Sequence, residues 1–229
     1  MTRKFLRRLS RKNFLVKNKL TRKNLNRLCE ENSTATKTLV VHSEDVDYEP
    51  FFPNTYTVTK RRDVPADLHV DSYYKDLSRI PSSSYEVILC TGLLEHIPDP
   101  QKIVDDFYRI LKPGGKIVLS ASSVFSLHES PDDFFHFTPY GVKLLFERWT
   151  RVDIKGSSQP FETIAILLQR INLQCDIFFP VRILVELFYL IIPILDRFIV
   201  RQYSTRHFRN EYSEIDSMMP SNVQVVAFK

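Results

Sequence analysis

The sequence predicts an α/β protein in which a largely parallel sheet is covered by helices on both faces. Two patterns predict this class: short apolar runs recur from Thr38 to the C-terminus, and polar or helix-forming stretches separate them. The composition agrees, because 43% hydrophobic and 26% charged residues are typical of a soluble globular protein. We expect a basic helical segment over residues 1–34, then one domain over residues 35–229 that includes an apolar helical insertion at 160–215.

Each expected strand is a short apolar or β-branched run bounded by polar or turn-forming residues. The run at residues 38–42 has the pattern of a strand buried on both faces of a sheet. In chain order the expected strands are residues 38–42, 56–59, a short extended piece at 68–70, then 85–90, 116–121, 151–154 and 222–228.

Two helices have clear start signals. Asp99 is placed to cap a first turn, and the proline after it occupies the first helical position, where its missing N–H costs nothing. The apolar residues that follow form one helix face: Ile103, Phe107, Ile110 and Leu111. The run Lys-Pro-Gly-Gly at residues 112–115 ends this helix and leads into the next strand. Thr138, also followed by proline, opens a second helix that we expect to reach about Trp149.

Glycine is scarce, and its distribution excludes one class of nucleotide-binding site. The chain has five glycines, and the first of them is Gly92. A Walker A loop, or a GxGxxG loop after an early strand, needs backbone conformations that only glycine permits, so neither is present. Three cysteines at wide spacings give no disulfide framework, and no secretory leader is visible, which together favour a cytoplasmic location.

Positive charge is concentrated at the N-terminus. Residues 1–28 contain eleven of the 32 Lys and Arg and no acid, which leaves 21 basic and 27 acidic residues, a net charge of −6, in the rest. Leucines and phenylalanines among the cations make the segment loosely amphipathic, so it suits peripheral contact with an anionic membrane at its inner surface. A solvated helix or tail is the alternative. Nucleic acid is disfavoured, because aromatic interleaving is sparse and the body is acidic.

Residues 177–200 are strongly apolar and raise the question of a membrane span. Arg182, Glu186 and Asp196, together with two prolines, interrupt the run, and charges at bilayer depth are costly. We therefore expect helices that pack on the sheet, on a second copy of the chain in a homodimer, or shallowly in a membrane interface.

Two linked motifs carry a resemblance to a known family. The segment Cys-Thr-Gly-Leu-Leu-Glu-His-Ile-Pro-Asp-Pro at residues 90–100 is followed by Phe-Tyr-Arg-Ile-Leu-Lys-Pro-Gly-Gly at 107–115 and a strand. This pair resembles the class I S-adenosylmethionine-dependent methyltransferases of the type 11-like group. The resemblance implies a seven-stranded Rossmann-like sheet with an antiparallel last strand, and S-adenosylmethionine bound across the carboxyl ends of the first strands.

The resemblance implies a set of cofactor-binding positions, two of which depart from the family's pattern. Where the family has a glycine-rich loop after the first strand, this chain has bulkier residues, and Lys60 stands near the position of the family's ribose-binding acid, although an ammonium can only donate hydrogen bonds. For Glu95 and His96, helix capping is the alternative role. The implied cofactor-binding residues are His42, Glu44, Asp71, Cys90, Glu95 and His96.

The loop after the fifth strand supplies the expected catalytic residue. Residues 128–141 are similar to a run found in a subgroup of the family often associated with glycan and cell-surface biosynthesis. His128 is the candidate base or acceptor-orienting residue, with a loop-ordering hydrogen bond as the alternative. Asp133 and His136 are expected to organise the substrate loop, and no metal site is expected.

The expected activity is therefore methyl transfer to a hydroxyl or carboxyl of a glycan or related small metabolite. The substrate part of this expectation rests on subgroup resemblance alone. The departures at residues 42, 44 and 60 motivate the alternative, a non-catalytic binding or scaffold protein that keeps the fold and has lost cofactor binding.

Overall fold

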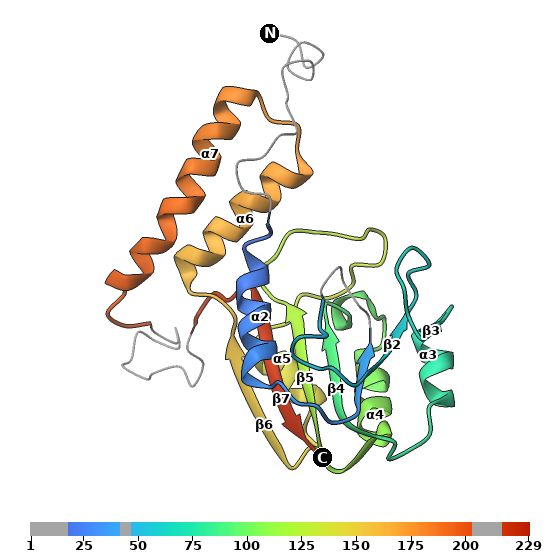
Figure 1. Ribbon diagram of the computed structural model, residues 1–229. Helices are drawn as coiled ribbons and strands as arrows, with labels where there is room; N and C mark the ends of the chain where they lie inside the picture. The colour runs from blue at the N-terminus through green and yellow to red at the C-terminus, as the bar shows by residue number, and fades with distance from the viewer. Residues whose placement is uncertain (1–17, 42–46, 203–216) are drawn as a thin grey trace.

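The computed structural model describes residues 18–41, 47–202 and 217–229, which form one seven-stranded sheet with helices on both faces (Figure 1). The order across the sheet is β3-β2-β1-β4-β5-β7-β6. Each expected strand is present. The strands are β1 (Thr38–Val41), β2 (Thr55–Thr59), β3 (Leu68–His69), β4 (Tyr85–Thr91), β5 (Leu111–Ser122), β6 (Arg151–Gly156) and β7 (Asn222–Phe228).

The sheet is parallel except at β7, as expected. The pairs β1–β2, β1–β4, β2–β3 and β4–β5 are all parallel, whereas β7 runs antiparallel to both of its neighbours, β5 and β6. Strand order therefore reverses between β1 and β4, because the chain builds outward from β1 to β3 and then returns to add β4. The carboxyl ends of these two strands meet at this switch point, where open α/β sheets leave a crevice.

Two helices follow directly after the capping residues that the sequence predicted, Asp99 and Thr138. The Asp99 side chain accepts the Lys102 N–H at 3.2 Å, and the Thr138 side chain accepts the Gly141 N–H at 3.0 Å. The helices are α2 (Thr21–Glu31), α3 (Tyr73–Asp76), α4 (Pro100–Ile110), α5 (Pro139–Leu145), α6 (Pro160–Gln174) and α7 (Phe179–Ile191), with the short 3-10 helices η1 (Leu77–Arg79), η2 (Leu94–His96) and η3 (Ile192–Phe198).

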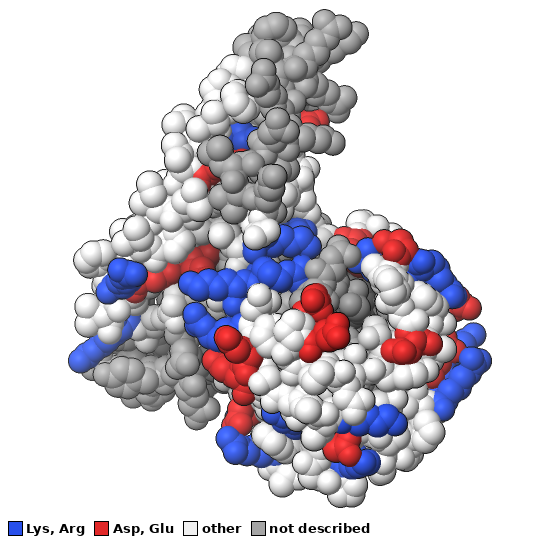
Figure 2. Space-filling model, in the orientation of Figure 1, with Lys and Arg blue, Asp and Glu red and all other residues white. Residues whose placement is uncertain are grey.

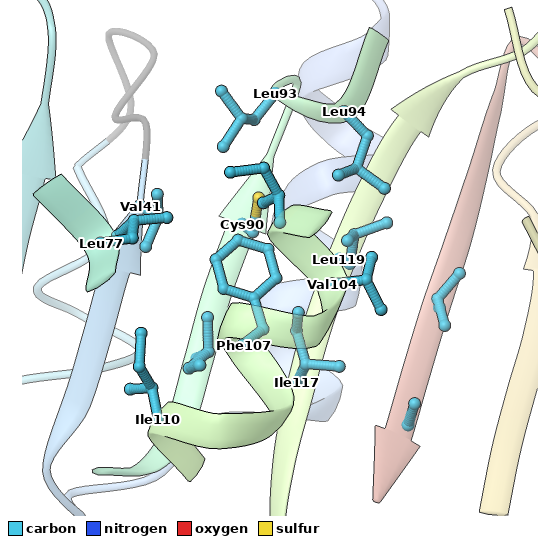
Figure 3. Close-up of a cluster of buried hydrophobic side chains, with 14 of the residues drawn as sticks. Val41, Leu77, Cys90, Leu93, Leu94, Val104, Phe107, Ile110, Ile117 and Leu119 are labelled. Atoms are coloured by element: carbon cyan, nitrogen blue, oxygen red, sulfur yellow. The ribbon is translucent and has the colours of Figure 1, made fainter. Parts of the chain in front are cut away.

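The two faces of the sheet have separate hydrophobic cores, because alternate strand residues point to opposite sides. In β4, Ile88 and Cys90 pack toward α3, α4 and α5, with Phe107 of α4 lying next to Cys90 (Figure 3). The intervening residues Val87 and Leu89 pack on the other side against α2. The expectation of helices on both faces is confirmed, and α2 belongs to the domain core.

Two element boundaries differ from the sequence-based expectation. Helix α5 ends at Leu145, because residues 146–149 form a turn in which the Trp149 N–H bonds to the Phe146 carbonyl at 3.0 Å. Strand β5 begins at Leu111, which pairs with Tyr85 before a shift in register. The 112–115 run is therefore part of β5, and a Cβ on its last residue, Gly115, would lie 2.8 Å from a carbonyl oxygen of β4.

Helices α6 and α7, with η3, lie within the range expected for the apolar insertion and project from the sheet as an arm (Figure 1). Residues 203–216 of the expected insertion lie outside the described residues. The inner stripe of α7 buries Arg182, Glu186 and Tyr189. Its outer stripe is apolar and exposed, and Leu184 keeps 66% of its surface accessible. Among the described residues, no helix combines the length and the apolar character that a membrane crossing requires.

Candidate functional site

The carboxyl ends of β4 and β5 open into a cavity of about 340 Å³. Helix α2 bounds it on one side, and α6 and β7 bound it on another, while residues 125–129 of the loop after β5 complete the wall. The first turn of α2 is tied to both neighbours, because Gln224 of β7 donates to the Asn24 carbonyl at 3.1 Å and the Asn24 amide donates to Glu162 of α6 at 3.0 Å. Segments far apart in sequence thus enclose one space beside the switch point.

The β4 end of the cavity carries a buried carboxylate. Gly92 turns the chain with a positive φ of 65°, and Thr91 before it shares a 2.6 Å hydrogen bond with the Tyr48 hydroxyl. Glu95, which is 1% exposed, accepts the backbone N–H of Ser122 at 3.1 Å and its hydroxyl at 2.6 Å. The backbone carbonyl of Glu95 also accepts two hydrogen bonds, from the N–H groups of loop residues 134 and 135. Glu95 therefore fixes the loop after β5 onto the end of β4.

His128 lies in the cavity wall and is held by Asp133. Its backbone N–H donates to Asp133 Oδ2 at 2.9 Å, and its Nδ1 lies 3.3 Å from the same oxygen. His136 Nε2 lies 3.5 Å from the other carboxylate oxygen of Asp133. His96 packs edge-on against the His128 ring with a centroid distance of 4.7 Å. The structure thus brings together four residues that the sequence predicted for this site.

The contacts of His128 determine which nitrogen carries its proton. Nδ1 is 3.1 Å from the Ser126 carbonyl and 3.3 Å from Asp133, and both of these groups only accept. Nδ1 therefore carries the hydrogen, and in the neutral ring Nε2 keeps its lone pair. Burial lowers the pKa of His128, and the neighbouring His96 lowers it further, against the opposing effect of Asp133. The neutral form is thus favoured near pH 7, as a general base requires.

The same cluster has the composition of a metal site. The potential ligand atoms of Glu95, His96 and His128 lie within 4.8 Å of one another, and so do those of His128, Asp133 and His136. Burial opposes ionisation of Asp133, but the His128 N–H and the surrounding imidazoles hold its pKa below the ordinary value. An ionised carboxylate facing imidazoles serves equally to orient a base, so the arrangement alone does not select a metal.

The predicted residues near β2 and β3 lie away from this cavity. The Asp71 side chain is 93% exposed and forms an ion pair with Arg62. The buried acid of this region is Asp76, which accepts the backbone N–H groups of Asp71 and Ser72, both at 3.1 Å. Lys60 is exposed, and the residue after it, Arg61, lines the cavity instead.

The remaining predicted residues are placed as follows. The thiol of Cys90 is fully buried in the core beside α4, where burial raises its pKa well above the ordinary value (Figure 3). His42 and Glu44 lie outside the described residues. Sequence reasoning missed the contributions of α2, α6 and β7. The polar Gln224 within an otherwise apolar strand was the available signal, because buried polar groups need partners.

Comparison with known proteins identifies this architecture. Residues 19–176, more than half of the chain, match the family described as a methyltransferase domain. A stretch of 57 residues, 25% of this chain, is 42% identical to the ubiquinone biosynthesis O-methyltransferase of Xanthomonas oryzae pv. oryzae. That stretch covers only 23% of the relative's length.

Two solved structures share the fold. A SAM-dependent methyltransferase from Archaeoglobus fulgidus aligns with a TM-score of 0.54 at 14% identity, over 92% of this chain and 93% of that chain. Phosphoethanolamine N-methyltransferase 2 of Haemonchus contortus, in complex with S-adenosyl-L-methionine, aligns with a TM-score of 0.53 at 12% identity, over 91% of this chain and 52% of that chain. These likenesses concern the fold. The family match carries the assignment, and it shows that this chain belongs to the methyltransferase-domain family.

Proposed function

We propose that the protein is an S-adenosylmethionine-dependent methyltransferase in which His128 is the general base. The observation that carries this proposal is the position of His128, whose imidazole lines the cavity beside the end of β4 while Asp133 contacts its Nδ1. Family membership and the bound cofactor of the Haemonchus contortus structure support the choice of cofactor.

The residues at the carboxyl end of β4 fit this cofactor. Its methionine portion carries a sulfonium and an ammonium, and the buried Glu95 carboxylate supplies the complementary negative charge. Gly92, which has no side chain, leaves room for close approach, and Thr91 offers a hydroxyl. Thr91, Gly92 and Glu95 are therefore the residues that would hold it, and the bound group would supply an activated methyl.

The chain's own contribution to the reaction is positioning and removal of a proton. The lone pair of His128 Nε2 accepts the proton of an acceptor hydroxyl as that oxygen becomes nucleophilic. Asp133 Oδ2, which lies 3.3 Å from Nδ1 on the opposite side of the ring, stabilises the imidazolium that results. A carboxyl acceptor arrives ionised, so for that substrate His128 orients the group without taking a proton.

The proposed acceptor is a hydroxyl or carboxyl group of a glycan or related small metabolite. The similarity of residues 128–141 to the glycan-associated subgroup supports this choice, and the cavity wall offers the hydroxyls and amides that sugar recognition uses. The side chains concerned are Thr21, Asn24, Ser120, Ser122, Ser157, Asn222 and Gln224.

Substitution of His128 tests the proposed base. Once a screen with labelled S-adenosylmethionine has found a hydroxyl acceptor, we expect His128→Gln to lower kcat by about 10²- to 10⁴-fold, the usual contribution of a positioned base. Its affinity for S-adenosylhomocysteine should stay within about twofold of wild type. Full activity of His128→Gln would contradict the role of His128. Wild-type turnover should persist in EDTA, and its loss would point to a metal at the histidine cluster instead.

We also propose that the protein works in the cytoplasm at the inner membrane surface. The exposed apolar stripe of α7 supports this location, and so do the eleven cations of residues 1–28. Because Leu28 is buried in the core, a truncation should remove only residues 1–17, which contain seven of these cations. The chain enters α2 beside the arm, since the Leu20 N–H donates to Gln169 of α6 at 2.8 Å.

Sedimentation with phosphatidylglycerol vesicles tests the membrane proposal. Leu184→Glu in the arm, and separately removal of residues 1–17, should each reduce the sedimented fraction several-fold, because apolar insertion and charge both contribute. The matched control is Leu144→Glu on α5, where the leucine is 64% exposed compared with 66% for Leu184. Unchanged sedimentation of both variants would contradict the proposal. A dimer in analytical ultracentrifugation that Leu184→Glu dissociates would assign the face to a homodimer.

A further inference from the structure

We propose that Arg170 of α6 is a positioning residue for His128, because it holds the loop segment from which that base projects. This inference rests on the proposed function, since it concerns the base of the same site. It extends that function from the sheet domain to the arm, because α6 is the helix of the arm that follows β6 (Figure 1).

His128 lies in a long connection that has no helix or strand of its own. Residues 123–138 join β5 to α5, and His128 stands near the middle of this run. A general base must stay within hydrogen-bond distance of the proton that it removes, and a misplacement of about 1 Å can cost about 10²-fold in rate. A base on such a loop therefore needs neighbouring side chains that fix its position.

One contact from Arg170 reaches His128 through Ser126. Arg170 Nε donates to Ser126 Oγ at 3.1 Å. The carbonyl oxygen of the same serine lies 3.1 Å from His128 Nδ1, the nitrogen that carries the hydrogen. Ser126 therefore links the guanidinium on α6 to the imidazole, and a displaced Ser126 would change the direction in which His128 Nε2 points.

A second contact passes through the ring of Phe125. The guanidinium carbon of Arg170 lies 4.8 Å from the centre of this ring, within the roughly 6 Å over which a cation attracts an aromatic face. The same ring packs edge-on against His128, with a centroid distance of 5.2 Å. Phe125 thus contacts both the guanidinium and the imidazole, and it carries the position of Arg170 to the base by packing.

A third contact from the same helix holds the next residue of the loop. Gln174 stands four positions after Arg170, and therefore on the same face of α6, and its side chain donates to the Leu127 carbonyl at 2.7 Å. Residues 125, 126 and 127 thus each contact α6 immediately before His128. Asp133, five positions later, accepts the His128 N–H. The base is therefore held on both sides along the chain.

Helix α6 is itself fixed to its neighbours, so it provides a firm support. At its start, the Asp196 carboxylate of η3 accepts the N–H groups of residues 161 and 162, both at 2.8 Å. Next to Arg170, the Gln169 side chain donates to the Asn18 carbonyl at 3.0 Å and accepts the Leu20 N–H at 2.8 Å. The segment that leads into α2 and the η3 end of the arm thus both hold the helix that carries Arg170.

Arg170 also lines the cavity, so positioning must be separated from direct contact with a ligand. Lys and Arg side chains gather where the projecting arm meets the rounded body (Figure 2). Four of them line the cavity: Lys19, Arg22, Arg61 and Arg170. A cation there has two direct roles besides support of the loop, contact with the acceptor and contact with the carboxylate of the cofactor.

A double-mutant cycle with His128→Gln makes this separation. Arg170→Gln is placed in the wild-type and in the His128→Gln backgrounds, and kcat and KM are measured with the hydroxyl acceptor from the screen. Calorimetry gives the affinity for S-adenosylhomocysteine. Arg170→Lys keeps the charge over Phe125. The matched control is Arg148→Gln, because Arg148 also lies over a ring, that of Tyr108 at 5.2 Å, and does not line the cavity.

We expect Arg170→Gln to lower kcat by roughly tenfold, with KM and the affinity for S-adenosylhomocysteine within about twofold of wild type. In the His128→Gln background the same change should lower kcat by less than about twofold, since a positioning residue has no effect once the base is absent. Arg170→Lys should recover part of the rate, and Arg148→Gln should match wild type.

Hydrogen exchange followed by mass spectrometry tests the hold on the loop without an acceptor. Exchange at residues 125–128 should be faster in Arg170→Gln than in wild type or Arg148→Gln, because the loop opens more often. If Arg170→Gln does not fold, Gln174→Ala carries both comparisons with a smaller effect, since Gln174 is exposed and contacts the same segment.

Four results would overturn the inference. An equal loss of kcat in both backgrounds would mean that Arg170 acts independently of His128. A raised KM would assign Arg170 to the acceptor, and weakened S-adenosylhomocysteine binding would assign it to the cofactor. Unchanged kcat and loop exchange would show that α6 does not hold the base. Failure of the proposed function looks different: S-adenosylhomocysteine would not bind, while faster loop exchange in Arg170→Gln would still support the hold of α6 on the loop.

Discussion

The sheet domain and the α6–α7 arm bury opposite kinds of side chain. In the sheet domain Phe107 is fully buried, with the apolar residues of β4 and β5 around it. In α7 the buried residues include Arg182 and Glu186, at 2% and 1% exposure, whereas Leu184 and Phe188 keep 66% and 55% of their surface accessible. The difference indicates that the sheet domain has an apolar core, whereas the outer face of α7 is an exposed apolar surface of the kind that interaction sites present.

The structure also shows how two of the charged residues that interrupt the apolar run at 177–200 are arranged on α7. Arg182 and Glu186 break the apolar run in sequence, and they are spaced four residues apart, so they share one face of α7. That face is the one that turns inward in the structure. The charges thus leave the outer face uninterrupted, which makes it more apolar than the average of the run suggests.

The largest expected effect tests the contrast through stability. Phe107→Ala should lower the free energy of unfolding by about 3–5 kcal/mol, because it opens a cavity in a fully buried core. Phe188→Ala, at an exposed position of the arm, should change it by less than about 0.5 kcal/mol. Urea unfolding followed by circular dichroism measures both. Equal destabilisation by the two variants would mean that the arm is covered within the protein, and the contrast would be lost.

A smaller effect is expected from Asp133→Asn. This substitution tests whether Asp133 supports His128 as the general base, so that the proposed chemistry depends on residues of the sheet domain. The carboxylate of Asp133 raises the pKa of His128, so a neutral amide should lower that pKa further. In wild type, burial already lowers the pKa of His128, and activity should fall only as pH drops through this lowered pKa, where the base becomes protonated. In Asp133→Asn the fall should move to lower pH, and the rate should be lower because the imidazolium loses its partner. An unshifted profile would separate Asp133 from the base.

Much of the fold could be predicted from sequence, because its signals are local. Asp99 and Thr138 cap the helices that their positions predict, and each apolar run forms a strand of the sheet. The end of α5 was less predictable, since the turn at residues 146–149 depends on how Trp149 packs against α4, where it contacts the Tyr108 ring. Burial of α2 against the sheet is likewise a tertiary effect.

The candidate site was predictable only in part, for the same reason. Glu95 and His128 stand in motifs with a fixed place after β4 and β5, so their presence at the cavity follows from local sequence. The presence of Arg22 and Gln224 at the cavity does not follow from local sequence. It depends on the contact between the first turn of α2 and β7, which joins residues 200 positions apart. The roles expected for Asp71 and Cys90 stay predictions, with Asp71 placed at the surface and Cys90 in the core.

Titration of the purified protein with S-adenosylhomocysteine by calorimetry tests the central claim most directly. The claim is that the cavity at the end of β4 still holds the cofactor, although residues 42 and 44 are not glycine. Lys60 also stands close to the position at which the family resemblance implies a ribose-binding acid. We predict saturable binding of one ligand per chain, with Gly92→Val weakening it because Gly92 borders the cavity with a φ of 65°, which a β-branched residue disfavours. No heat of binding at millimolar ligand would contradict the claim and favour a non-catalytic protein of the same fold.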